Sequence, residues 1–147
     1  MRSSPPWLRL TIHATFSAMW LIGVAVFVLK HFFRTASEFG PAVHPWQPTL
    51  TEIHGIVAVL ATFLFGWIAA DHVAVTWRGA ADRVSGVALI VLLALLIATG
   101  FASFFLALDS WRDSDAALHE YLGLALFLPW LVHLTWGRRR KNGELRA

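Results

Sequence analysis

The sequence contains no cysteine among its 147 residues. This absence excludes disulfide bonds, thiolate-held iron–sulfur clusters, thiol nucleophiles and covalent cofactor attachment through a C-x-x-C-H motif. Charge is also scarce, because Asp, Glu, Lys and Arg together make up only 14% of the chain, whereas a soluble domain usually has about 25%. Hydrophobic residues make up 57%, and we therefore predict a membrane protein.

Four apolar segments are long enough to cross a bilayer. A hydrocarbon layer of about 30 Å needs roughly 20 residues of helix at about 1.5 Å per residue. The segments that meet this length are 9–32, 49–70, 84–107 and 116–136. We predict an all-α membrane protein, a bundle of four transmembrane helices, in which residues 1–147 form a single membrane domain. Little chain remains for a folded domain outside the membrane, so a catalytic partner would be another polypeptide.

Basic residues predict the orientation of these spans. Nine of the twelve Lys and Arg residues lie at the N-terminus, at the C-terminus or between the second and third spans. The other three, Lys30, Arg34 and Arg112, lie on the opposite side. Because basic residues concentrate in short cytoplasmic loops, we predict that both termini are cytoplasmic. The net charge of +3 reflects this bias toward the cytoplasmic leaflet, and we expect no nucleic-acid partner.

Ionisable side chains are rare within the predicted spans. Such groups are costly in hydrocarbon, so they usually face the interior of a bundle and mark a function. The ionisable residues inside the spans are His13, Glu52, His54, His119, Glu120 and His133. The third span contains none, and we expect it to be a packing helix.

Four of the histidines fall at two predicted depths. His54 and His119 lie near the outer edge, whereas His13 and His133 lie near the inner edge. His119 and His133 are four turns apart at about 3.5 residues per turn, so both imidazoles face the same side of the helix, about 21 Å apart by rise. A haem iron takes two neutral imidazole nitrogens from opposite sides. The pattern predicts two b-type haems, one held by His54 and His119 and the other by His13 and His133, with no other metal site and no catalytic side chain.

Other interpretations of these histidines stay open. A lone intramembrane histidine can be a hydrogen-bonded packing group or a proton relay. His72 competes with His13 as a ligand, because it also lies near the inner edge and on the same face as His54. It is about 27 Å beyond His54 by rise, which overshoots the level of His133, and we place it at the interface. His31 lies too far out to be a ligand, and His44 lies in a proline-rich loop.

Three segments resemble a known family. They are Arg9-Leu-Thr-Ile-His13, His54-Gly55, and Leu118-His119-Glu120 through His133. They are similar to the di-haem cytochrome b subunit of respiratory formate dehydrogenases, the gamma-subunit type, and to related small bacterial b-type cytochromes. In that family four helices carry two haems, with ligands from the first, second and fourth helices. The resemblance implies the same two ligand pairs.

The resemblance also implies electron transfer across a bacterial inner membrane. Electrons would pass between a redox partner subunit, an iron–sulfur protein or a cytochrome in a multi-subunit complex, and the quinone pool. Asp71, His72, Trp77 and Arg78 are candidates for a quinone site near the inner haem, although a polar helix end at the membrane surface explains them equally well. The first alternative is a stand-alone small cytochrome b that couples quinone to a small reactant such as superoxide. The second is a haem-free membrane anchor or permease.

Overall fold

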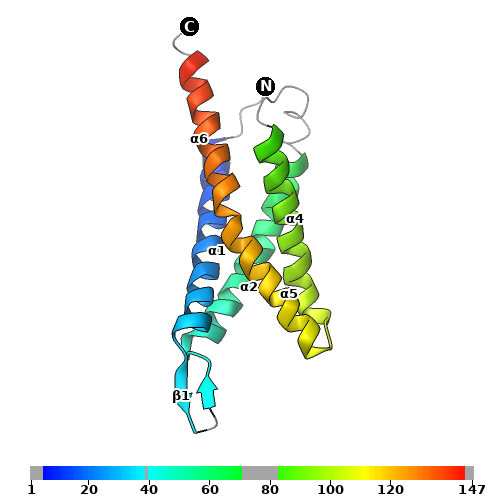
Figure 1. Cartoon of the computed structure of the whole chain (residues 1–147). Helices are drawn as coiled ribbons and strands as arrows, with labels where there is room; N and C mark the ends of the chain where they lie inside the picture. Colours follow the sequence, from blue (N-terminus) through cyan, green and yellow to red (C-terminus); the bar gives the residue numbers. More distant parts are fainter. Residues whose placement is uncertain (1–4, 39, 71–82, 145–147) are drawn as a thin grey trace. The chain divides into compact units, whose positions relative to one another are not determined.

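The computed structural model describes residues 5–38, 40–70 and 83–144, and these are predominantly helical. The helices are α1 (Pro6–Phe32), α2 (Trp46–Ile68), α4 (Arg83–Phe105), α5 (Asp109–Ala125) and α6 (Phe127–Glu144), shown in Figure 1. The chain divides into two compact units, Met1–Trp67 and Ile68–Ala147. The first contains α1 and nearly all of α2, and the second contains α4, α5 and α6. Each unit is described by itself.

The four predicted spans are confirmed. Within the described residues, four segments are long and apolar enough to cross a membrane: Pro6–Phe32, Trp46–Ile68, Val84–Phe105 and Asp109–Thr135. The first three agree with the predicted limits to within three residues at each end. The chain is therefore an all-α, multi-pass membrane protein.

The predicted start of the fourth span is wrong. The fourth span was predicted to begin at residue 116, but α5 begins at Asp109. Asp109 lies in the first turn, where a carboxylate interacts favourably with the helix dipole, and it forms an ion pair with Arg112. The hydroxyl of Ser114 donates to the carbonyl of Ser110. The start was predicted from the apolar segment 116–136 alone. Residues 109–115 are polar, and the helix includes them, so it begins before that segment.

The connection between α1 and α2 is a short hairpin. Strands β1 (Thr35–Ser37) and β2 (Gly40–Ala42) pair antiparallel, and Gly40 has a φ of 108°, which favours glycine. His44 precedes α2 and accepts two amide hydrogens from its first turn. Its Nδ1 accepts that of Trp46 at 3.2 Å, and its carbonyl oxygen accepts that of Gln47 at 2.9 Å. His44 therefore has a structural role at a helix start.

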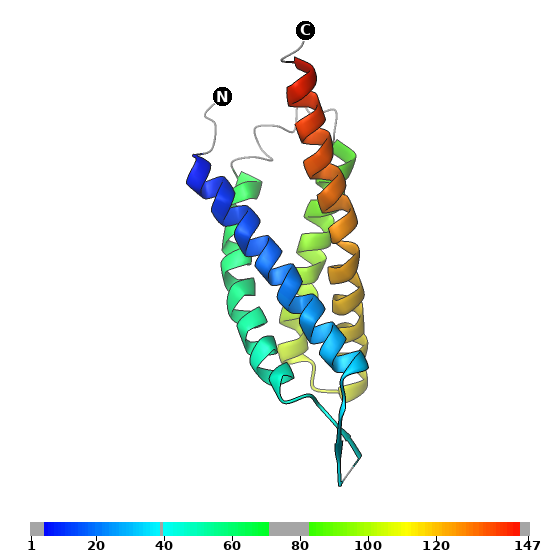
Figure 2. The same cartoon turned by 90° about the vertical axis from the view of Figure 1, so that its left-hand side faces the viewer.

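In the second unit, α4 packs antiparallel against α5 and α6 (Figure 2). Helices α5 and α6 meet at Leu126, whose φ of −56° and ψ of −29° are helical. Pro129 has no amide hydrogen for the carbonyl of Ala125, which accounts for the discontinuity. The bonds on either side persist, from Leu126 to Leu122 and from Trp130 to Leu126. The two helices therefore make one candidate span that tolerates a proline.

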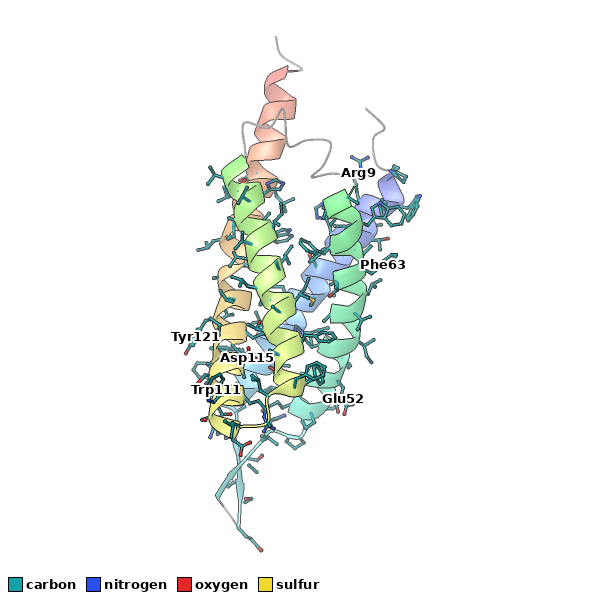
Figure 3. All side chains as sticks on the ribbon, turned by 90° about the vertical axis from the view of Figure 1, so that its right-hand side faces the viewer. Arg9, Glu52, Phe63, Trp111, Asp115 and Tyr121 are labelled. Carbon is teal, nitrogen blue, oxygen red and sulfur yellow. The ribbon has the colours of Figure 1, made fainter. Side chains whose placement is uncertain are left out.

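The distribution of side chains suits a hydrocarbon environment. Large apolar side chains face outward, including Ile56, Val59 and Phe104, which are 72%, 73% and 83% exposed. Figure 3 shows Phe63 and Tyr121 pointing away from their helices. The buried residues are Leu8, Ala61, Leu64, Leu96, Thr15, Ser85 and Thr99. Small and hydroxyl-bearing residues at helix contacts, with large apolar residues outside, are typical of membrane helices.

Exposed tryptophans lie at helix starts. Trp7 is in the first turn of α1, Trp46 is the first residue of α2, and Trp111 is in the first turn of α5. Tryptophan prefers the boundary between hydrocarbon and water. Trp7, Trp46 and Trp111 therefore suit positions at such a boundary.

The four spans found among the described residues predict that both termini lie on the same side of the membrane, and the basic residues predict that this side is the cytoplasm. Alkaline phosphatase folds only outside the cytoplasm, so we expect it to be inactive when fused after Ala147. Inserted in the β1–β2 turn at Gly40, it should be active. Enzyme assays on whole cells measure both, and the reverse pattern would overturn the predicted orientation.

Candidate functional site

His119 is held by a threonine of α4. Its Nδ1 lies 2.8 Å from the hydroxyl oxygen of Thr99, and His119 is half-buried on α5. The Thr99 hydroxyl donates to the carbonyl of Leu95 at 2.9 Å and makes a longer contact with that of Leu96 at 3.3 Å. A hydroxyl has one hydrogen. Thr99 either gives it to the Leu95 carbonyl and accepts from Nδ1–H of His119, or gives it to Nδ1, and the tautomer of His119 decides between the two.

His133, at the other predicted depth, also contacts a hydroxyl of α4. Its Nδ1 lies 3.2 Å from the hydroxyl oxygen of Ser85, near the start of α4. Ser85 is buried, at 7% exposure, and His133 is half-buried on α6. The two histidines of the fourth span thus use the same ring nitrogen toward the same neighbouring helix.

The register of the antiparallel helices produces this correspondence. Moving along α4 from Ser85 to Thr99 covers the same number of residues as moving back from His133 to His119. Four residues further along α4, the Ser103 hydroxyl donates to the Asp115 carboxylate at 2.6 Å, four residues before His119 (Figure 3). The prediction that both imidazoles face one side of their span is confirmed. Their levels differ by about 21 Å by rise.

A glycine follows each of the two hydroxyl residues on α4. A Cβ built on Gly100 would lie 3.2 Å from Cε1 of His119, and one on Gly86 would lie 3.9 Å from Cε1 of His133. The first distance is tighter than an ordinary contact, whereas the second is ordinary. Each histidine ring therefore packs against a hydroxyl–glycine dipeptide of α4, which we call its seat: Thr99-Gly100 for His119 and Ser85-Gly86 for His133. The ring of His119 lies closer to its seat than the ring of His133 does.

His54 makes a comparable contact in the first unit. A Cβ built on Gly23 of α1 would lie 3.2 Å from Cε1 and 3.7 Å from Nδ1 of His54, which is on α2. The Nδ1 atom of His54 is buried. His54 thus presents the same ring edge to a glycine of the adjacent helix.

The remaining predicted site residues are His13 and the four candidates for the quinone site. His13 lies exposed on α1. The expected pairs, His54 with His119 and His13 with His133, each combine the two units and stay predictions. The candidates for the quinone site, Asp71, His72, Trp77 and Arg78, lie outside the described residues. Within the described ranges, no three His, Asp or Glu side chains gather as a metal-binding group. A haem with two axial imidazoles needs no such group.

The expectation that the third span is a packing helix is incomplete. Helix α4 packs against α5 and α6, and it also supplies a hydroxyl to each of their histidines. The sequence carries a signal for this, because Ser-Gly and Thr-Gly recur on the third span at the spacing that separates His119 from His133. A search limited to ionisable residues does not find it.

The difference between the two seats can be tested with matched alanine variants. Gly100→Ala should crowd His119 and destabilise the protein by about 1–3 kcal/mol, the usual cost of overpacking. Gly86→Ala should be nearly neutral, because its Cβ would meet His133 at an ordinary contact distance. Thermal unfolding in detergent, followed by circular dichroism, measures both. Equal destabilisation by the two substitutions would contradict the geometry.

Comparison with family models, curated proteins and solved structures gave no match for this chain. The function is therefore argued from the chemistry of the site.

Proposed function

We propose that the protein is a di-haem b-type cytochrome that transfers electrons across a bacterial inner membrane. His54 and His119 would be the axial ligands of one haem, and His13 and His133 those of the other. The observation that carries the proposal is the arrangement of His119 and His133, two half-buried imidazoles on one side of a membrane span, four turns apart, each anchored through Nδ1.

The ligand chemistry of these residues fits haem. Iron binds a neutral imidazole through a ring nitrogen that carries a lone pair. The hydroxyl of Thr99 contacts Nδ1 of His119, and with its own hydrogen directed to Leu95 it would place the lone pair on Nε2. The absence of cysteine limits the chain to haem that is not covalently attached. A haem bound by two imidazoles supplies a one-electron ferric–ferrous couple.

The apolar segment between the two histidine levels favours electron transfer over ion transport. On α4, residues 87–98 are all Val, Ala, Leu or Ile. A Cβ built on Gly123 would lie 3.8 Å from Leu96, so α4 and α5 approach closely in this region. Transport of ions would require polar or charged groups along the path. Electrons need none, so this segment supports a cytochrome rather than a permease.

The proposed route connects a redox partner on one face with quinone at the other. The levels of His119 and His133, about 21 Å apart by rise, span most of a hydrocarbon layer of about 30 Å. Exposed Trp46 and Trp111 at the starts of α2 and α5 suit contact with a partner subunit. Asp71 and His72 offer a proton donor and a hydrogen-bond partner to a quinone near the inner haem.

Haem content in histidine variants tests the proposal and the pairing together. A pyridine haemochrome assay on the purified chain should give two haems. His54→Ala and His119→Ala should each lose one, and the double variant should retain one, because both residues serve the same haem. Combining His54→Ala with His133→Ala should remove both haems.

His31→Ala and His44→Ala are the matched controls and should retain two haems. His31 contacts Phe27 with ring centroids 4.5 Å apart, and His44 starts α2. A chain that contains no haem when haem is supplied during expression would overturn the proposed function. Loss of both haems in the His54→Ala/His119→Ala variant, with one retained in His54→Ala/His133→Ala, would reverse the pairing.

Reduction by quinol tests the inner site. Addition of a short-chain quinol to the oxidised protein should reduce its haems, and stopped-flow absorbance measures the rate. Asp71→Asn should slow this reduction roughly 100-fold, because the amide can still form a hydrogen bond but cannot take up the proton that quinol releases on oxidation. An unchanged rate in Asp71→Asn would place the quinone contact elsewhere.

A further inference from the structure

We infer that α4 positions the axial ligands and sets the reduction potentials of the two haems separately, through Thr99 at one level and Ser85 at the other. This inference rests on the proposed function. It assigns to the third span, which carries no ligand of its own, a role in the electronic properties of both iron sites.

The first step concerns the tautomer of the ring. A histidine ligand that donates its second ring N–H to an oxygen is fixed in tautomer and orientation and becomes a stronger base toward the metal. Thr99 would meet this requirement for His119 by giving its hydrogen to the Leu95 carbonyl, 2.9 Å away, which would leave its oxygen to accept from Nδ1–H at 2.8 Å. Ser85 occupies the corresponding position for His133.

The second step concerns ring orientation. Gly100 and Gly86 follow the two hydroxyl residues, and each allows Cε1 of a histidine to approach the α4 backbone. A ring held by a hydrogen bond at Nδ1 and by a backbone contact at Cε1 has little freedom to rotate. The dipeptide therefore controls both the direction of the ring and the position of its proton.

The two seats differ in strength. The Thr99 contact is 2.8 Å, and the Cβ distance at Gly100 is 3.2 Å, whereas the corresponding values at Ser85 and Gly86 are 3.2 Å and 3.9 Å. In a shorter hydrogen bond the Nδ1 proton lies closer to its acceptor, which leaves more electron density on the ring. Nε2 then donates more strongly to iron. The stronger effect is therefore expected on the haem held by His119.

The direction of the effect follows from this donor strength. A more basic imidazole stabilises ferric over ferrous iron, which lowers the reduction potential. Removal of the hydroxyl should raise the potential of the corresponding haem alone. A purely structural role for Thr99 or Ser85 would not produce a shift confined to one haem.

A redox titration of the purified full-length chain, followed by absorbance, provides the test. Thr99→Val should raise the midpoint potential of one haem, and Ser85→Ala should raise that of the other by a smaller amount. Thr99→Ser should restore the original value, because it returns the hydroxyl. Ser114→Ala is the control, because its hydroxyl bonds only to the Ser110 carbonyl of its own helix among the contacts described, and it should leave both potentials unchanged.

A second measurement does not depend on the haem content of the variants. In the chain labelled with ¹⁵N-histidine and reduced to the diamagnetic ferrous state, His119 should show a protonated Nδ1 that exchanges slowly with solvent. The same experiment reports the tautomer if the purified chain contains no haem. Proton occupancy of Nε2 at His119, or unchanged potentials in Thr99→Val with both haems bound, would overturn the inference. Absence of haem with Nδ1 protonated would instead overturn the proposed function and leave the hydrogen bond intact.

Discussion

An imidazole or hydroxyl that leaves water for hydrocarbon has to find its hydrogen bonds within the protein, because an unmade bond there is expensive. The second unit satisfies this constraint by pairing polar groups across two antiparallel segments. Three contacts in one continuous register join α4 to the fourth span: Ser85 with His133, Thr99 with His119, and Ser103 with Asp115. A shift of that register by one residue would break all three contacts together. These hydrogen bonds therefore fix how α4 lies against α5 and α6.

The same constraint links packing to function. His119 and His133 each contact an α4 hydroxyl through Nδ1, and the proposed cofactors would bind through Nε2. Gly100, next to Thr99, allows the His119 ring to lie closer to α4 than a Cβ would comfortably permit, whereas Gly86 leaves ordinary space beside His133. Pro129 interrupts the backbone hydrogen bonds between the two histidines, yet the register persists on both sides of it. The fourth span can therefore present two similar sites, one near each end.

Much of the fold could be predicted from the sequence, because the length of an apolar segment is a direct consequence of bilayer thickness. The start of α5 could not, because residues 109–115 are polar and continue the helix beyond the apolar segment. The facing of His119 and His133 followed from their spacing alone. By contrast, the hydroxyl partners depended on how two helices are aligned, and spacing within one helix does not determine that alignment. Thr99 and Ser103 also bond to their own helix backbone, which is the usual behaviour of such residues and conceals a second role.

The two ligand pairs are predicted from the sequence, and each joins a histidine of the first unit to one of the second. His54 shows the same contact between ring edge and glycine as His119, and His13 lies exposed on α1. The most direct test of two bis-histidine haems is low-temperature electron paramagnetic resonance of the oxidised protein, with integration of the ferric signals. The account predicts two low-spin signals of bis-imidazole type that together amount to two spins per chain. A high-spin signal, which indicates iron with a missing axial histidine, or an integrated intensity of one spin or less, would contradict it.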